Sequence, residues 1–222
     1  MEKENKSYLI GIDDAGRGPV LGSMFLAGVL IEKDKQEELR TLGAKDSKLL
    51  SPATRRSLAR KIKRSYKFHI EKSTPKEIDD CDNLNNLEAI KSAMIINRLA
   101  SGLKGEIEAI VDCPSVNIEA WSAYLSNLII DHNIKITAEH KADFNHPVVS
   151  AASIIAKETR EEEVAQIRKE LDVKFGSGYP SDPQTIEFIK HNYKNEKYKD
   201  IIRHSWDTVK QLEKKSKQKQ FS

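Results

Sequence analysis

The chain has 222 residues, of which 38% are hydrophobic, so it is long enough for one large or two small domains with an ordinary core. Lysine and arginine exceed aspartate and glutamate by 37 − 34 = 3 charges, which is too little to identify a nucleic-acid partner. Charged residues interrupt every apolar stretch, which excludes a membrane span and a secretion signal, and we expect a cytoplasmic protein. Cys81 and Cys113 stand alone, which argues against a disulfide framework or a zinc site.

The first third of the chain predicts three strands. Residues 8–12 and 25–31 are short apolar runs, and the glycine-rich turn GRGPVLG lies between them. A third candidate strand, residues 66–70, follows a basic helix that begins at Pro52.

The middle of the chain alternates between strand and helix patterns. Residues 107–111 and 134–138 are further apolar runs. A helical spacing of three and four residues joins Leu84, Leu87, Ile90 and Met94. Strands that alternate with helices predict an α/β fold with a mixed central sheet flanked by helices.

The last third has few strand signals. Residues 148–171 read as one helix, and Pro180 begins another. We therefore predict a core over residues 1–145, a mainly helical C-terminal part over residues 146–213 that packs on it, and a disordered basic tail over residues 214–222.

Two stretches are rich in basic residues. From Lys210 the chain reads KQLEKKSKQKQFS, and a second group contains Arg55, Arg56, Arg60, Lys61, Lys63 and Arg64. Both could contact phosphates. A solvated helix face and a frayed tail are the simpler interpretation.

Four aspartates occupy positions where a site could form. Asp13 and Asp14 follow the first apolar run, Asp112 ends the run AIVD, and Asp143 precedes a predicted helix. The carboxyl ends of strands in α/β sheets are common binding sites, and carboxylate oxygens suit Mg²⁺ or Mn²⁺. Each aspartate also has an ordinary interpretation as a turn former, strand terminator or helix cap. The pattern alone leaves both interpretations open.

Several longer blocks resemble one known family. The stretch GIDDAGRG over residues 11–18 resembles the opening signature of ribonuclease HII. Further blocks resemble that family in the same order, namely DSKLLS, NLNNLE, VDCPSVN, HKADFNHPVVSAASIIAK, GSGYPSDP and RHSWDTV. The resemblance covers residues 8–212, and the forms AEHKAD and SWDTV look more archaeal than bacterial.

The resemblance implies an RNase H-like core with four acidic ligands, which fall here on Asp13, Asp14, Asp112 and Asp143. They would be catalytic and would hold two divalent cations, Mg²⁺ or Mn²⁺, one activating water and the other stabilising the leaving oxygen. The implied activity is hydrolysis of the RNA strand of RNA–DNA hybrids and cutting at ribonucleotides embedded in duplex DNA. The products would carry 3′-hydroxyl and 5′-phosphate ends.

The resemblance also implies substrate-binding residues. Gly16, Arg17 and Gly18 would read the 2′-hydroxyl, because glycines let backbone groups approach closely. Tyr179 would pack on the sugar of the following deoxynucleotide. Ser47 and Lys48 would meet the backbone phosphate. The ordinary interpretations are a tight turn, a half-buried tyrosine and a solvated loop.

Two features depart from the family pattern. Asp14 stands where the family usually has Glu, so a catalytically weakened hybrid-binding protein on the same fold is an alternative, as is another two-metal nuclease on this scaffold. The tail SKQKQFS has one aromatic residue, so binding to a sliding clamp is not predicted. We expect a monomer that acts on nucleic acid and does not bind membranes.

Overall fold

The computed structural model describes residues 6–43 and 50–220 of the chain. The described residues form two compact units. The sheet unit takes its residues from Met1–Ala15, Phe25–Lys72 and Asn83–Thr159, and the helical unit from Gly16–Met24, Ser73–Asp82 and Arg160–Ser222.

A mixed five-stranded sheet forms the centre of the sheet unit, in the order β3-β2-β1-β4-β5. Its strands are β1 (Ser7–Ala15), β2 (Met24–Glu32), β3 (Lys67–Ser73), β4 (Glu106–Asp112) and β5 (Lys135–Glu139). Strand β1 pairs antiparallel with β2 and parallel with β4, which itself pairs parallel with β5. All five strands predicted from the sequence are present, and the predicted fold class is confirmed.

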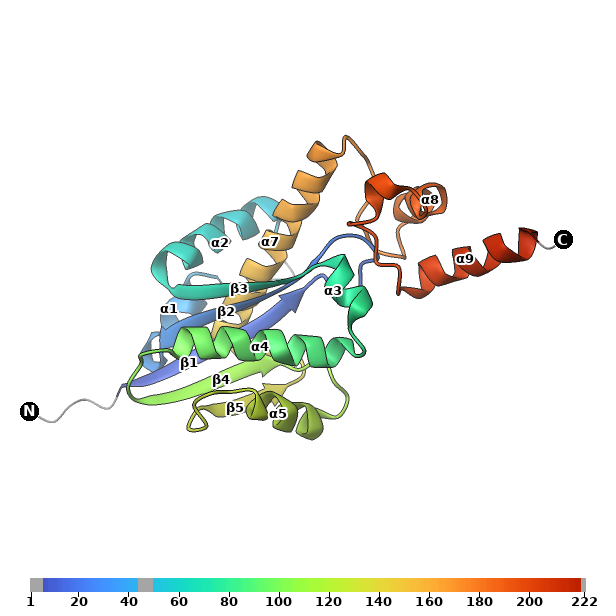
Figure 1. Cartoon of the computed structure of the whole chain (residues 1–222). Coiled ribbons are helices and arrows are strands. Elements are labelled where there is room, and N and C mark those ends of the chain that lie inside the picture. Colours follow the sequence, from blue (N-terminus) through green and yellow to red (C-terminus); the bar gives the residue numbers. More distant parts are fainter. Residues whose placement is uncertain (1–5, 44–49, 221–222) are drawn as a thin grey trace, which may run out of the picture. The chain divides into compact units, whose positions relative to one another are not determined.

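Helices cover both faces of this sheet (Figure 1). On one face lie α4 (Leu84–Ala100) and α5 (Ile118–Asn127). The other face is covered by α1 (Gln36–Thr41), α2 (Pro52–Ser65) and the first half of α7 (Pro147–Glu170), whose apolar residues share one core with β1 and β2. The short helices η1 (Lys33–Lys35) and α6 (Ala142–Asn145) follow β2 and β5.

The helical unit has its own apolar core. Its helices are α3 (Pro75–Asp80), the second half of α7, α8 (Pro183–Asn192), η3 (Glu196–Tyr198) and α9 (Asp207–Gln220). Phe188 packs edge-on against Tyr198, with ring centroids 5.0 Å apart, and is tilted against Phe175. No named strand follows β5 among the described residues, in agreement with the sequence prediction.

The two compact units are made of non-contiguous segments, and the predicted domain boundary at residue 145 stays a prediction. The first half of α7, up to Thr159, belongs to the sheet unit because its small apolar residues are buried against the sheet. Helix α9 continues to Gln220 through residues that favour helix, and disorder of residues 214–222 stays a prediction. Phe221 and Ser222 lie outside the described residues.

Helix α4 was predicted by the correct spacing but buries a different face. Ile90 and Met94 of the predicted stripe are 39% and 45% exposed, whereas Ala89, Ala93 and Ile96 are buried. Small residues let the helix come closer to the sheet than the longer side chains would.

Within the described part of the chain, no helix is both long enough and apolar enough to cross a bilayer.

Helix α7 crosses strand β1 at Gly11 with almost no space between them. A Cβ atom added to Gly11 would lie 2.4 Å from the carbonyl carbon of Val148 and 2.5 Å from the amide nitrogen of Val149. Both are backbone atoms, which cannot rotate away as a side chain can.

We predict that Gly11→Ala lowers the free energy of unfolding by about 1–3 kcal/mol, because the helix must move off the sheet. Urea denaturation measures the change. Gly18→Ala is the control for stability, since its added Cβ would meet Tyr179 at an ordinary distance of 3.5 Å. Equal stability of Gly11→Ala and the native chain would show that the helix has room to shift.

Candidate active site

The four predicted acids all lie in the sheet unit. Asp13 and Asp14 are near the carboxyl end of β1, and Asp112 is the last residue of the parallel neighbour β4. Asp143 is in the first turn of α6, which follows β5. The carboxyl ends of three adjacent parallel strands therefore supply all four residues.

Asp13 is the most buried of the four. It is only 6% exposed, and its Oδ1 accepts a hydrogen bond of 2.8 Å from the backbone N–H of Asp14. Burial raises the pKa of Asp13 well above its usual value, and the negative charges of Asp14 and Asp112 raise it further. The Ser153 hydroxyl acts in the opposite direction by stabilising the carboxylate.

Asp112 is tied to the segment that carries Asp143. Its Oδ1 accepts a 2.9 Å hydrogen bond from the backbone N–H of Ala142, the residue directly before Asp143. Lys141 has a left-handed backbone with φ of 58°, and this sharp bend starts α6 immediately after β5. Asp143 is 8% exposed, so the bend brings a second largely buried carboxyl to this end of the sheet.

The four acids do not form a ready metal-binding cluster. Within residues 6–43 and 50–220, no three His, Cys, Asp or Glu side chains are arranged so that they could hold a metal ion. Asp13, Asp14 and Asp112 are near enough for their charges to interact. Like charges in one place repel unless a cation or protonation relieves them.

The turn that follows β1 belongs to the helical unit and contains Gly16, Arg17 and Gly18. Gly16 has φ of 92°, and an added Cβ would lie 2.8 Å from the carbonyl oxygen of Ser23. Glycine is therefore required at this position by both backbone conformation and space.

Arg203 holds this turn from within the helical unit. Its side chain is fully buried, and it donates to the carbonyl oxygens of Gly16 at 2.6 Å, Arg17 at 3.0 Å and Gly22 at 2.9 Å. Its guanidinium also stacks on Trp206, 4.9 Å from the ring centroid. Burial, followed by the positive charge of Arg160, lowers the pKa of Arg203 to about 10, so it stays charged at neutral pH.

Asp79 anchors the chain next to Arg203. Its carboxylate accepts hydrogen bonds of 2.8 Å from the backbone N–H groups of His204 and Ser205, and one of 2.6 Å from the Ser205 hydroxyl. Arg203 thus holds the turn after β1, and Asp79 of α3 holds the residues that follow Arg203.

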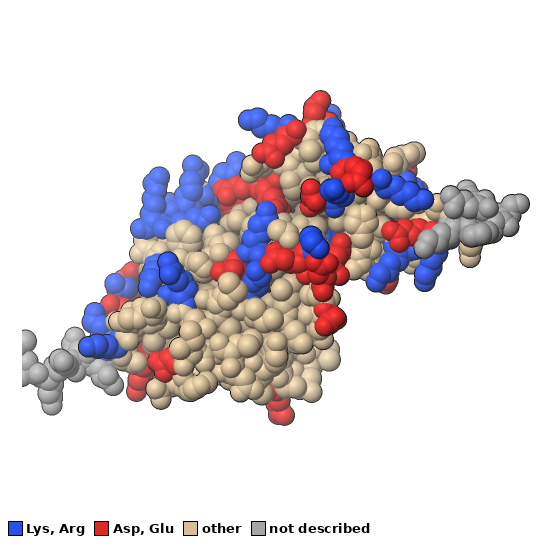
Figure 2. Space-filling model, viewed as in Figure 1, with Lys and Arg blue, Asp and Glu red and all other residues tan. Residues whose placement is uncertain are grey.

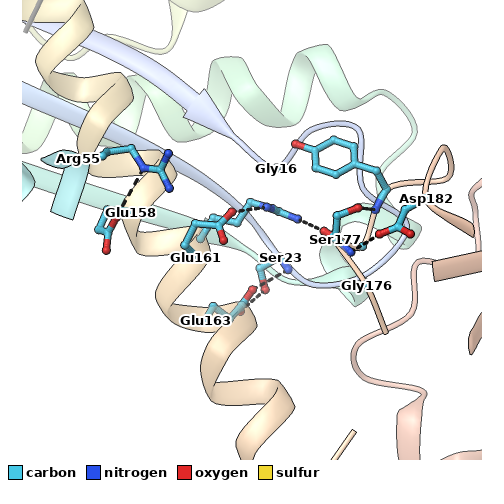
Figure 3. A network of polar contacts seen from close by, with 12 residues as sticks. Gly16, Ser23, Arg55, Glu158, Glu161, Glu163, Gly176, Ser177 and Asp182 are labelled. Atoms are coloured by element: carbon cyan, nitrogen blue, oxygen red, sulfur yellow. Dashed lines mark hydrogen bonds and ion pairs between the residues drawn. The ribbon is translucent and has the colours of Figure 1, made fainter. Parts of the chain in front are cut away.

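Tyr179 lies in the same unit as the glycine turn and is 39% exposed. The Arg160 guanidinium lies 5.1 Å from its ring centroid and donates to the carbonyl oxygen of Ser177 at 3.0 Å. Asp182 accepts from the Ser177 backbone N–H at 2.5 Å, which fixes the loop that carries Tyr179 (Figure 3). The hydrogen bond from the Ser177 backbone N–H also lowers the pKa of Asp182.

The predicted substrate residues Ser47 and Lys48 lie outside the described residues. The structure adds three functional candidates that sequence analysis did not identify, namely Ser153, Arg160 and Arg203. Arg203 begins the block RHSWDTV, and Arg160 follows SAASIIAK by three positions. An arginine within or just after a block that resembles the family could have indicated these two residues as functional candidates.

A mixed sheet with acids at the carboxyl ends of its parallel strands is the arrangement expected of an RNase H-like core. The family model described as Ribonuclease HII matches residues 10–209. The chain belongs to the ribonuclease HII family and is an endoribonuclease.

Named relatives are similar to this chain in sequence or structure over nearly its whole length. Ribonuclease HII of Methanocaldococcus jannaschii is 41% identical, and the match covers 95% of this chain and 96% of that protein. Ribonuclease HII of Pyrococcus furiosus is 39% identical, and the match covers 94% of this chain and 92% of that protein. The crystal structure of ribonuclease H2 from Pyrococcus horikoshii matches with a TM-score of 0.83 and 36% identity, over 94% of this chain and 98% of that one. The Archaeoglobus fulgidus PCNA:RNase HII complex matches with a TM-score of 0.80 and 38% identity, over 92% and 96%.

We predict that Arg203→Lys lowers the free energy of unfolding of the helical unit by about 3 kcal/mol, because lysine cannot bond three carbonyl groups and leaves buried acceptors unpaired. Denaturation followed by Trp206 fluorescence, in a Trp121→Phe background, measures this. Arg98 is exposed, so Arg98→Lys is the matched control and should have the free energy of unfolding of the native chain. Equal stability of both variants would show that Arg203 does not hold the turn.

Proposed function

We propose that the protein hydrolyses the RNA strand of RNA–DNA hybrids and cuts at ribonucleotides embedded in duplex DNA, leaving 3′-hydroxyl and 5′-phosphate ends. The main support is the grouping of Asp13, Asp14 and Asp112 at the carboxyl end of β1 and β4, in a chain of the ribonuclease HII family.

The four aspartates would hold divalent cations. Their donor atoms are all carboxylate oxygens, which suit Mg²⁺ and Mn²⁺. Asp13 is buried beside two further acids, so bound positive charge would relieve the repulsion that raises its pKa. When bound, a pair of such ions supplies an activated water and stabilises charge on the scissile phosphate and leaving oxygen.

The glycine turn would recognise the 2′-hydroxyl. Arg203 binds the carbonyl oxygens of Gly16 and Arg17. Because a trans peptide places its C=O and N–H on opposite sides, the N–H groups of Arg17 and Gly18 point away from Arg203. We propose that this face of the turn meets the ribose, and that Arg203 is a positioning residue for it.

Tyr179 would pack on the sugar of the deoxynucleotide that follows the ribonucleotide. Its ring rests against Arg160, which limits the directions in which it can turn. The exposed part of the ring can contact a sugar. Ser47 and Lys48 would contact the neighbouring backbone phosphate.

The remaining proposals concern partners and location. We propose a cytoplasmic monomer. The Archaeoglobus fulgidus relative has been solved in complex with PCNA. For this chain, lack of clamp binding stays a prediction from the tail SKQKQFS, and titration of a labelled clamp with the full chain tests it.

Incubation with a duplex that carries one ribonucleotide, in Mg²⁺, Mn²⁺ or EDTA, tests the proposed function. We expect metal-dependent cutting beside the ribonucleotide and no cutting of an all-DNA duplex of the same sequence. Binding without cutting in either metal would favour the alternative, a catalytically weakened hybrid-binding protein. Equal cutting of both duplexes would contradict the proposed reading of the 2′-hydroxyl.

We predict that Asp112→Asn abolishes cleavage and leaves duplex binding and folding nearly unchanged. The amide keeps an oxygen that can accept from the Ala142 N–H but loses the ligand charge. Cleavage rates and duplex anisotropy measure the two effects. The matched control is Asp34→Asn, an exposed acid of η1, which should cut as the native chain does. Cleavage by Asp112→Asn within a few-fold of native would remove it from the site.

We predict that Asp14→Glu equals or raises the Mg²⁺-supported rate, and that Asp14→Ala lowers it strongly. The family's usual Glu reaches about 1.5 Å further, comparable to the tolerance of a metal site. The native chain should therefore favour Mn²⁺, which accepts less ideal geometry than Mg²⁺. Single-turnover rates in each metal test this. An inactive Asp14→Glu would mean that the site is built around the shorter side chain, and a fully active Asp14→Ala that Asp14 is not a ligand.

A further inference from the structure

Helix α2 carries a continuous positive charge on its outer side. Its sequence, PATRRSLARKIKRS, contains six cations and no acid. Leu58, Ala59 and Ile62 form the inner side and are buried in the core of the sheet unit. Figure 2 shows lysine and arginine side chains gathered over this helix.

Among the described residues, only the first turns of α2 have an acidic partner, Glu158. Glu158 of α7, whose side chain is 2% exposed, accepts a 2.8 Å hydrogen bond from Arg56 and lies 3.5 Å from Arg55 (Figure 3). In the part of the chain that the structure describes, no acidic side chain pairs with Arg60, Lys61 or Arg64, and all three are exposed. The later turns therefore present uncompensated charge to solvent.

The end of α2 that contacts Glu158 lies near the candidate active site. Glu158 follows Ser153 by five positions on α7, which is about 7.5 Å along the helix axis. The Ser153 hydroxyl lies close enough to the Asp13 carboxylate to lower its pKa. Arg60 and Arg64 lie about 6 and 12 Å beyond Arg56 along α2.

The chemistry of this surface suits a regular polyanion. Arg56, Arg60 and Arg64 recur every four residues, so they lie along one side of the helix. Duplex DNA carries about one negative charge per 1.7 Å of its axis, so a row of cations about 12 Å long can meet several phosphates. Arginine also binds phosphate oxygens in a bidentate manner.

We propose that the outer side of α2 is a second contact surface for the phosphate backbone of the substrate duplex, several nucleotides away from the cut. This proposal rests on the proposed function, because it takes the four acids as the place of cutting. The surface adds affinity that is independent of sequence and does not take part in the chemistry.

The test replaces Arg60 and Arg64 together by glutamine, which is also a good helix former. Anisotropy in EDTA measures binding of an uncut duplex of about 30 base pairs, longer than the 21 Å or so of the helix. We expect the dissociation constant to rise about tenfold at low salt and the slope of log K against log salt to fall by roughly 1.8, about 0.9 per phosphate lost. In metal, KM should rise on this duplex while kcat is unchanged.

The control is Arg98→Gln with Lys104→Gln, two exposed cations of the same unit. They precede the amino end of β4, whereas the acids lie at its carboxyl end. The control should bind as the native chain does, and both variants should cut a short duplex limited to the ribonucleotide and its neighbours at the native rate.

An unchanged salt slope in Arg60→Gln/Arg64→Gln would show that α2 is only a solvated helix face and would overturn the proposal. An equal loss in the control would overturn it as well, because the effect would then come from net charge. Failure of the native chain to cut in any metal would count against the proposed function alone, since the binding measurement in EDTA does not depend on cutting.

Discussion

Helix α7 and strand β1 meet at Gly11, where even one added carbon would lie 2.4 Å from the helix backbone. The approach requires glycine in the strand and small residues in the first half of the helix, as in SAASIIAK. It brings Ser153 beside Asp13, and five residues later it brings Glu158 beside Arg56. The proposed metal site and the basic surface of α2 are therefore placed by the same packing contact.

This packing also makes the acidic site electrostatically unfavourable. Asp13 is buried with Asp14 and Asp112 nearby, and burial together with like charge raises its pKa. A protein gains no stability from such an arrangement, which is typical of sites that bind a cation or perform chemistry. The Ser153 hydroxyl and the Asp14 backbone N–H offset only part of the cost.

The helical unit stabilises the irregular backbone of the glycine turn after β1. Carbonyl groups in such a turn lack the partners that a helix or sheet provides. Arg203 supplies three hydrogen bonds from a position 187 residues beyond Gly16, and Arg160 orients Tyr179 in the same unit. Both proposed substrate contacts of this unit therefore depend on buried arginines that need not touch the substrate.

The sequence by itself determined the five strands, most helices and the family, and it placed acids at the ends of the predicted strands. These features depend on local patterns, since an apolar run followed by Asp at residues 13 and 112 places a carboxylate at a strand end. Only the tertiary structure decided which face of α4 is buried, because that helix has apolar residues on several sides, including the exposed Ile90 and Met94. It also decided that α7 divides at Thr159, and that Arg203 holds the glycine turn. Such choices depend on contacts between residues far apart in the chain, which local periodicity does not contain.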